Sequence, residues 1–219
     1  MKQLNFKRYI VTYSLILVCV IVYLYTSVTY SFDMSAYDGY EAGGFMPLAI
    51  YVDREYYRFF SANFIHFGIS HLLMNMFSLY NIGPFLESAY GKIRYLILIL
   101  GSAICTTVLP YFYFIIVEGP YSQSSFTVSG GASGIILGLV GGLCCMAVFY
   151  KSIFSSAFKS ILPSLILIVV ISITVPTVSL SGHLGGFIGG FITTFILIKQ
   201  KPLYMWHLKK KQDYTNRPC

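Results

Sequence analysis

Long apolar runs dominate this sequence and leave it few ways to fold. The first extends from Tyr9 to about Val28 without a charged residue, and about 20 mostly apolar residues suffice for a helix to cross a membrane. Of all residues 56% are apolar and 11% charged, and the mean hydropathy is +0.70. A soluble globule of this size carries far more charge. We therefore predict an all-α integral membrane protein.

Six segments have the length and composition of spanning helices. They fall at about 9–28, 66–86, 93–117, 131–150, 160–176 and 181–199. We expect residues 1–199 to form one six-transmembrane-helix bundle and residues 200–219 to form a short basic cytoplasmic tail. The first segment follows a basic start, as in a signal peptide, but it is too long for one and lacks a small-x-small cleavage site. We expect it to be retained as the first helix.

Positive charges divide unequally between the two sides of these spans. Of the 15 Lys and Arg residues, all but Arg54 and Arg58 fall on one side, which the positive-inside rule assigns to the cytoplasm together with both termini. The loop over about 29–65 is then extracytoplasmic, and its many apolar residues predict that it lies partly in the outer leaflet. The basic, aromatic tail around Trp206 is typical of an anchor at the inner face, so no nucleic-acid partner is expected. The absence of an appended soluble domain or transit peptide favours a prokaryotic plasma membrane.

Four polar side chains stand out inside these spans, because the bilayer disfavours polar groups and those present usually have a function. His71 and Asn75 are four residues apart in the second span and share one face of a helix. Ser133 begins the fourth span and His183 the sixth. The predicted topology brings all four to a similar depth on the extracytoplasmic side. Hydrogen bonding between packed helices is an alternative explanation for such residues.

Glycines recur at every fourth residue beside Ser133 and His183. The fourth span and the sixth each contain such a row, namely Gly130, Gly134, Gly138 and Gly142, and Gly182, Gly186 and Gly190. Rows of small residues let two helix backbones approach closely. We expect the two rows to pack together and to bring Ser133 within hydrogen-bonding reach of His183.

A serine beside a histidine suits nucleophilic catalysis, because the neutral imidazole can take the hydroxyl proton. The spans offer no acid as a third member, and the nearest acids, Glu87 and Glu118, fall at a span end and in a loop, so we predict a dyad. The oxyanion of a tetrahedral intermediate needs hydrogen-bond donors. The Asn75 amide, the His71 ring and the backbone N–H of the serine, at a helix N-terminus, are the candidates.

Other chemistries fit the sequence less well. The chain has no His-Glu-x-x-His motif for zinc and no Asp inside the spans for an aspartyl protease. Its five cysteines include no pair at metal-ligand spacing. We expect no metal and no cofactor. A small transporter is an alternative, but its paired broken helices or inverted repeats are not visible.

Three ordered motifs contain the polar residues singled out above: His66-x4-His71-x3-Asn75, Gly131-Ala132-Ser133-Gly134 and His183-Leu184-Gly185-Gly186-x3-Gly190. Over nearly its whole length the chain resembles the rhomboid intramembrane serine proteases. The resemblance implies a six-helix core with a water-filled cavity that opens outward. It implies that Ser133 is the nucleophile, His183 the general base and then acid, and His71 and Asn75 the oxyanion donors. It also implies structural roles near the site for a further set: His66, Gly131, Gly134, Gly186, Gly190, Arg58 and Glu87.

One departure from the family is Leu137, where an aromatic residue often packs on the catalytic histidine. The sequence therefore predicts an active enzyme with a differently packed base. The resemblance implies hydrolysis of peptide bonds in or near the outer end of transmembrane segments of other membrane proteins, after a small residue. It also suggests that a tilting fifth span admits the substrate beside the second. A catalytically inactive rhomboid-like protein that binds membrane helices is the main alternative function.

Overall fold

The structure is a computed structural model, which describes residues 7–151, 154, 156, 159, 160, 162 and 179–200. In these residues the protein is all-helical, apart from one isolated bridge between Phe45 and Ser129. The predicted span over 160–176, except for residues 160 and 162, and the tail over 200–219, except for residue 200, lie outside the described residues.

Long helices correspond to five of the six predicted spans within the described residues. They are α1 (Ile10–Thr29), α5 (Ile69–Tyr90), α6 (Lys92–Phe112), α7 (Ser133–Phe149) and α9 (Leu180–Gln200). The α6 helix continues as a π-helical segment, η2 (Tyr113–Glu118). Three of the helices in the described part, α1, α6 with η2, and α9, are long and apolar enough by composition to cross a membrane, and α7 is a shorter apolar helix. The protein is an integral membrane protein with a helical bundle.

Helix α5 is displaced from the span expected over 66–86. It begins at Ile69, because Gly68 is extended with φ −168° and ψ 165°. It continues through Pro84 and ends at Tyr90, and the following residue, Gly91, has a φ of +74°. A residue in this left-handed conformation ends a helix, and glycine adopts it without strain. As a consequence, His66 lies in the connection before α5 and not in the helix.

The long loop over 29–65 is folded into short helices. These are α2 (Ala36–Glu41), α3 (Pro47–Val52), α4 (Arg58–Ser61) and the 3-10 turn η1 (Ala62–Phe64). A further 3-10 turn, η3 (Gln123–Phe126), precedes α7. Ser35 and Asp38 form a capping box at the start of α2, in which each side chain accepts a hydrogen bond from the backbone of the other. The loop is therefore ordered by local capping as well as by packing.

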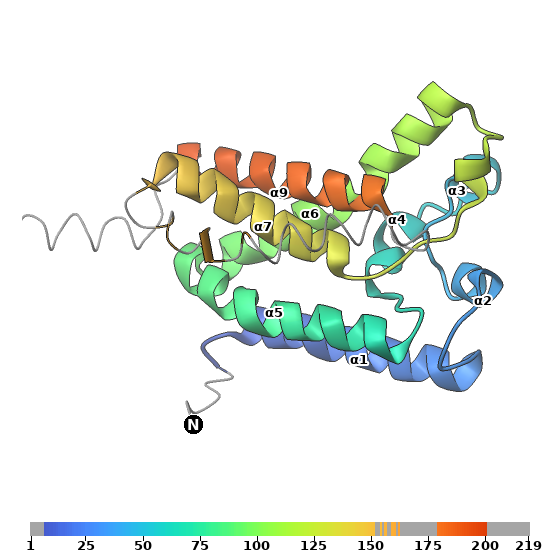
Figure 1. Ribbon diagram of the computed structural model, residues 1–219, viewed down its shortest axis with the longest axis horizontal. Helices are drawn as coiled ribbons and strands as arrows, with labels where there is room; N and C mark the ends of the chain where they lie inside the picture. The colour runs from blue at the N-terminus through green and yellow to red at the C-terminus, as the bar shows by residue number, and fades with distance from the viewer. Residues whose placement is uncertain are drawn as a thin grey trace, which may run out of the picture.

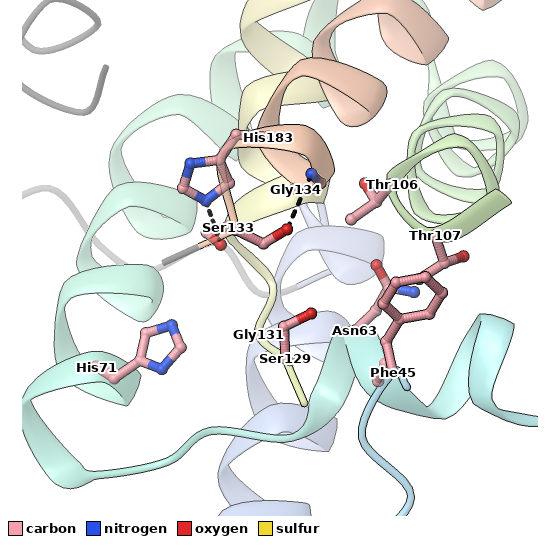
Figure 2. A pocket seen from close by; sticks show the side chains of 14 residues that line it. Phe45, Asn63, His71, Thr106, Thr107, Ser129, Gly131, Ser133, Gly134 and His183 are labelled. Carbon is pink, nitrogen blue, oxygen red and sulfur yellow. Dashed lines mark hydrogen bonds between the residues drawn. The ribbon is translucent and has the colours of Figure 1, made fainter. Parts of the chain in front are cut away.

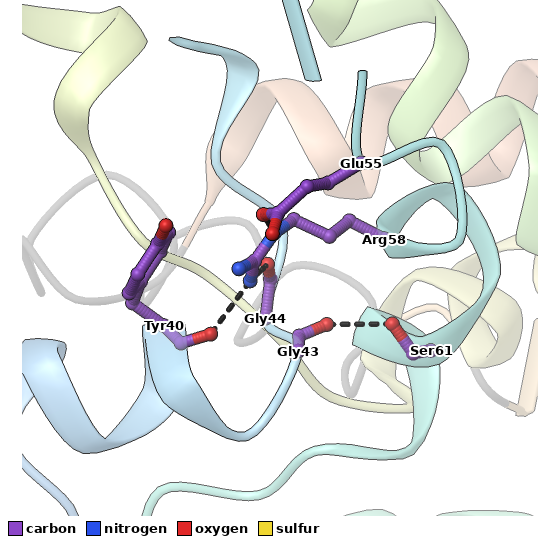
Figure 3. A network of polar contacts seen from close by, with 6 residues as sticks. All are labelled: Tyr40, Gly43, Gly44, Glu55, Arg58 and Ser61. Atoms are coloured by element: carbon purple, nitrogen blue, oxygen red, sulfur yellow. Dashed lines mark hydrogen bonds and ion pairs between the residues drawn. The ribbon is translucent and has the colours of Figure 1, made fainter. Parts of the chain in front are cut away.

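Arg58 ties this loop together from within, because its side chain is only 2% exposed. Its Nε atom donates to Glu55 Oε2 over 2.6 Å, and its NH1 group donates to the carbonyl oxygens of Tyr40 and Gly44 over 2.6 and 2.9 Å. Its guanidinium also lies over the Tyr40 ring, 4.2 Å from the centroid. Figure 3 shows these contacts converging on one side chain. A buried guanidinium with three acceptors holds its segments firmly.

Two groups of helices make up the bundle. Helices α7 and α9 pack against each other and against α6, while α1 packs against α5 (Figure 1). The N-terminal ends of α5, α7 and α9 lie at the end of the bundle where α2, α3 and α4 gather. Residues that begin these three helices are thereby brought to one end of the molecule, under the folded loop.

Glu87 joins the other end of α5 to α1. Its carboxylate, 2% exposed, accepts hydrogen bonds from the backbone N–H groups of Val11 and Thr12 over 3.1 and 2.9 Å, and from the Thr12 hydroxyl over 2.8 Å. These N–H groups lie in the first turn of α1, which has no acidic residue of its own. A carboxylate at a helix N-terminus satisfies unpaired donors and interacts favourably with the helix dipole. Glu87 therefore caps α1 from a neighbouring helix.

Candidate active site

Ser133 and His183 meet at the start of two adjacent helices. Ser133 is the first residue of α7, and His183 lies in the first turn of α9. The Ser133 Oγ atom and the His183 Nε2 atom are 2.7 Å apart, which is a short hydrogen bond (Figure 2). His183 is 9% exposed and Ser133 is half-buried, so the imidazole is largely shielded from its surroundings. A hydroxyl bonded to a ring nitrogen in this way can lose its proton to the ring.

Gly134 and Gly138 of α7 face Gly186 and Gly190 of α9 beneath this pair, whereas Gly130, at the start of the predicted row, precedes α7 and lies against Ala62 and Ile65. A Cβ atom at Gly186 would overlap the carbonyl oxygen of Gly134, and one at Gly190 would overlap the carbonyl oxygen of Gly138. The two backbones are therefore in direct contact, as small residues permit between membrane helices. Ser133 and His183 both lie in the first turns of these helices. The contact between the two backbones therefore sets the distance between their side chains.

The segment over 129–132 directly precedes α7 and positions Ser133; it is called the strap below. Within it, Gly131 has φ +123°, a conformation that disfavours any residue with a side chain. Its N–H donates to the Ala62 carbonyl over 2.9 Å. A Cβ atom at this position would also lie 2.8 Å from the His71 ring. Glycine is thus required here both for the backbone turn and for the space beside His71.

His66 holds the next residue of the strap. The Ala132 N–H donates to His66 Nε2 over 3.4 Å, and His66 Nδ1 lies 3.0 Å from the Phe64 carbonyl oxygen. A carbonyl can only accept, so Nδ1 carries the proton and Nε2 is the acceptor, which is one consistent neutral tautomer. His66 is fully buried, and its ring packs edge-on against that of His71 at 5.1 Å.

The two predicted oxyanion donors occupy different positions. His71 lines the pocket that contains Ser133 and His183. The Asn75 side chain does not line it, and its amide donates to the His71 carbonyl over 2.8 Å. The Asn75 Oδ1 atom is buried without a hydrogen-bond partner among the described residues. The structure thus brings His71 to the pair and directs the Asn75 amide to its own helix.

Arg58 and Glu87 lie apart from this pocket. Neither is among its lining residues, and their contacts hold the loop over 29–65 and the start of α1. One link does connect the Arg58 region with the strap: Phe45, next to Gly44, exchanges backbone hydrogen bonds of 2.7 and 2.9 Å with Ser129.

The pocket itself is small, with a volume of about 40 Å³, which is more than a single water needs. Its lining includes polar residues that the sequence did not single out, namely Asn63, Thr106, Thr107 and Ser129. A hydroxyl in a predicted span and an Asn in a loop are common, so the sequence offered only a weak signal for them. No carboxylate lines the pocket in the described part of the chain, and no cluster of metal-ligating side chains occurs there.

Comparison with known proteins places the chain in one family. The Rhomboid domain model matches residues 53–200. The rhomboid protease GluP of Bacillus subtilis is 30% identical over 46% of this chain and 18% of its own length. The putative rhomboid protease YdcA of the same organism is 33% identical over 45% of each chain, and RHOMBOID-like protein 4 of Arabidopsis thaliana is 37% identical over 41% of this chain and 20% of its own. The matched regions thus cover less than half the length of each of these relatives. With most of its length matched by the domain model, it belongs to the rhomboid family.

Proposed function

We propose that this protein is an intramembrane serine endopeptidase that uses Ser133 and His183 as a catalytic dyad. The observation that carries the proposal is the 2.7 Å hydrogen bond between Ser133 Oγ and His183 Nε2 inside a small pocket. Membership of the rhomboid family supports protease activity at the level of the family. The dyad, the substrates and the orientation in the membrane are parts of the proposal.

The chemistry follows from the two side chains. His183 Nε2 takes the Ser133 proton as Oγ attacks the carbonyl carbon of the scissile peptide bond, and a tetrahedral oxyanion forms. The protonated imidazole then donates its proton to the leaving amine nitrogen, so the C–N bond breaks and an acyl-enzyme remains. The same imidazole then deprotonates a water, whose oxygen attacks the ester carbon, and the imidazolium returns the proton to Ser133 Oγ as the C–Oγ bond breaks and the acid product leaves.

Donors for the oxyanion are available at the start of α7. The backbone N–H of Ser133, the first residue of the helix, has no intrahelical partner, and the helix dipole favours negative charge there. We assign His71 as a second donor because it lines the pocket. For Asn75 to be a third, its amide has to exchange the bond to the His71 carbonyl for one to the oxyanion.

The proposed substrates are transmembrane segments of other proteins, cut in or near their extracytoplasmic ends. A peptide bond becomes accessible only after the substrate helix unwinds locally, because its backbone is otherwise hydrogen-bonded within itself. The proposal has both termini of the protein in the cytoplasm and the pocket opening to the other side. The predicted entry of substrate beside the fifth span remains a prediction, because that span lies outside the described residues.

A cleavage assay in liposomes with a model transmembrane substrate tests the dyad. We expect Ser133→Ala and His183→Ala each to abolish cleavage, and Ser133→Ala to abolish labelling by a fluorophosphonate probe. The matched control is Ser78→Ala, the same change on the outward face of α5. Undiminished cleavage by either dyad variant would refute the proposal. Binding of the substrate helix without cleavage by the wild type would favour the inactive rhomboid-like alternative.

A further inference from the structure

One buried acceptor beside the pocket has no donor among the residues that the structure describes. The Asn63 side chain is 1% exposed and lines the pocket together with Ser133 and His183. Its Nδ2 group lies 3.3, 3.2 and 3.3 Å from the carbonyl oxygens of Phe59, Phe60 and Ala103. All three partners can only accept, so the amide orientation is fixed by chemistry. The Oδ1 atom is left buried with no partner in the described residues.

Two threonine hydroxyls next to Asn63 already donate hydrogen bonds to backbone carbonyl oxygens. Thr106 Oγ1 donates to the Ser102 carbonyl over 2.8 Å. Thr107 Oγ1 donates to the Phe59 carbonyl over 2.8 Å. Figure 2 shows the Asn63 carboxamide beside these two threonines. Asn63 and these two threonines therefore present oxygen lone pairs, which favour a ligand group that donates a hydrogen bond.

The size of the pocket limits what that group can be. A volume of about 40 Å³ has room for a group of a few atoms, such as a hydroxymethyl. In the proposed reaction, the residue before the scissile bond has its side chain on the carbon next to the attacked carbonyl. In the proposed reaction this side chain enters the pocket that Ser133 and Asn63 both line. A buried acceptor there without a donor is unfavourable by about 1–3 kcal/mol.

We propose that Asn63 makes the site selective for serine before the scissile bond, by accepting a hydrogen bond from the substrate hydroxyl. The inference rests on the proposed function and adds a specific preference to it. A resident water is the other source of a hydroxyl donor. If the substrate hydroxyl is the donor, serine is the favoured residue. If a resident water is the donor, alanine is cleaved as well as serine, because the water fits beneath an alanine methyl and is displaced by a larger side chain.

The test compares three transmembrane substrates that differ only in the residue before the cut: serine, alanine or 2-aminobutyrate, in which a methyl replaces the hydroxyl at nearly the same volume. We expect the wild-type kcat/KM for serine to exceed that for 2-aminobutyrate by about 5- to 150-fold, the factor that corresponds to an unpaired buried acceptor. Serine should also exceed alanine. Equal values for serine and 2-aminobutyrate overturn the inference, as does alanine cleaved as well as serine, which assigns the acceptor to a water.

Variants sharpen the comparison. In Asn63→Leu the ratio of serine to 2-aminobutyrate should fall to about one or below. The control, Asn81→Leu, makes the same change at an exposed position of α5 and should keep the wild-type ratio. Should Asn63→Leu fail to fold because the carbonyls of Phe59, Phe60 and Ala103 lose the amide that they share, the wild-type ratios alone decide. Cleavage of all three substrates with no preference contradicts only this inference. Cleavage that persists in Ser133→Ala contradicts the proposed function.

Discussion

Gly190 of α9 lies against the carbonyl oxygen of Gly138 of α7, with no room for a side-chain carbon between them. The obstacle is backbone, which cannot rotate away as a flexible side chain would. Two helices thus meet at van der Waals distance directly below Ser133 and His183. Every change in this spacing alters the distance between the hydroxyl and the imidazole.

Gly190→Ala should separate the two helices. We expect a loss of about 1–3 kcal/mol in unfolding free energy from overpacking, and at least a tenfold fall in kcat, since a small misplacement of reacting groups has large effects. Thermal unfolding in detergent micelles and a cleavage assay measure these changes. Ile192→Ala, at a half-exposed position of the same helix, serves as the control. A variant with wild-type kcat would mean that the spacing does not control the dyad.

His66→Leu should leave the Ala132 N–H and the Phe64 carbonyl without their partner. Each unsatisfied buried group costs about 1–3 kcal/mol. We also expect kcat to fall more than KM rises, because the strap that precedes Ser133 loses its anchor. If stability fell while kcat per folded molecule stayed constant, His66 would support the fold without positioning the serine.

His71→Ala should affect catalysis more than Asn75→Ala. His71 lines the pocket, whereas the Asn75 amide is bonded to the His71 carbonyl. Removing one oxyanion donor typically lowers kcat by about 100- to 1000-fold, and we expect this loss for His71→Ala with little change in KM. Steady-state kinetics of both variants measure it. Equal losses would indicate that Asn75 turns into the pocket during the reaction.

Arg58→Lys should weaken the folded loop, although the charge is retained. A lysine ammonium cannot reach Glu55, Tyr40 and Gly44 at once or stack on the tyrosine ring as a planar guanidinium does. We expect a lower Tm and faster proteolysis of the segment over 29–65. Arg54→Lys makes the same change at an exposed side chain, which donates a 3.4 Å hydrogen bond to the Tyr56 hydroxyl, and it should behave as the wild type. Indistinguishable stabilities for the two variants would refute this role.

Glu87→Gln should uncap α1. The neutral amide keeps one acceptor oxygen for the three donors of Val11 and Thr12 and loses its charge interaction with the helix dipole. Because these groups are buried, we expect a loss of about 1–3 kcal/mol in unfolding free energy. Glu118→Gln, at an exposed position after α6, should have no effect. Equal Tm values for Glu87→Gln and the wild type would contradict the capping role.

The sequence was sufficient for the membrane class, because apolar runs of this length have no other stable environment than a bilayer or a helical core. Family membership could also be predicted from the sequence, since the ordered motifs around His71, Ser133 and His183 are short contiguous stretches of it. The ends of the helices were harder to predict from the sequence. The start of α5 depends on the extended conformation of Gly68, which a hydropathy pattern does not reveal.

Tertiary structure alone decided which polar groups face one another. The bond from the Ala132 N–H to His66, the capping of α1 by Glu87 and the bond from Asn63 to the Ala103 carbonyl join groups that are 66, 75 and 40 residues apart in the chain. The imidazole of His183 is aligned on Ser133 although Leu137 stands where an aromatic is common in the family. Side-chain directions at such distances follow from how helices pack, so the sequence determines the groups available for chemistry and the packing determines their geometry.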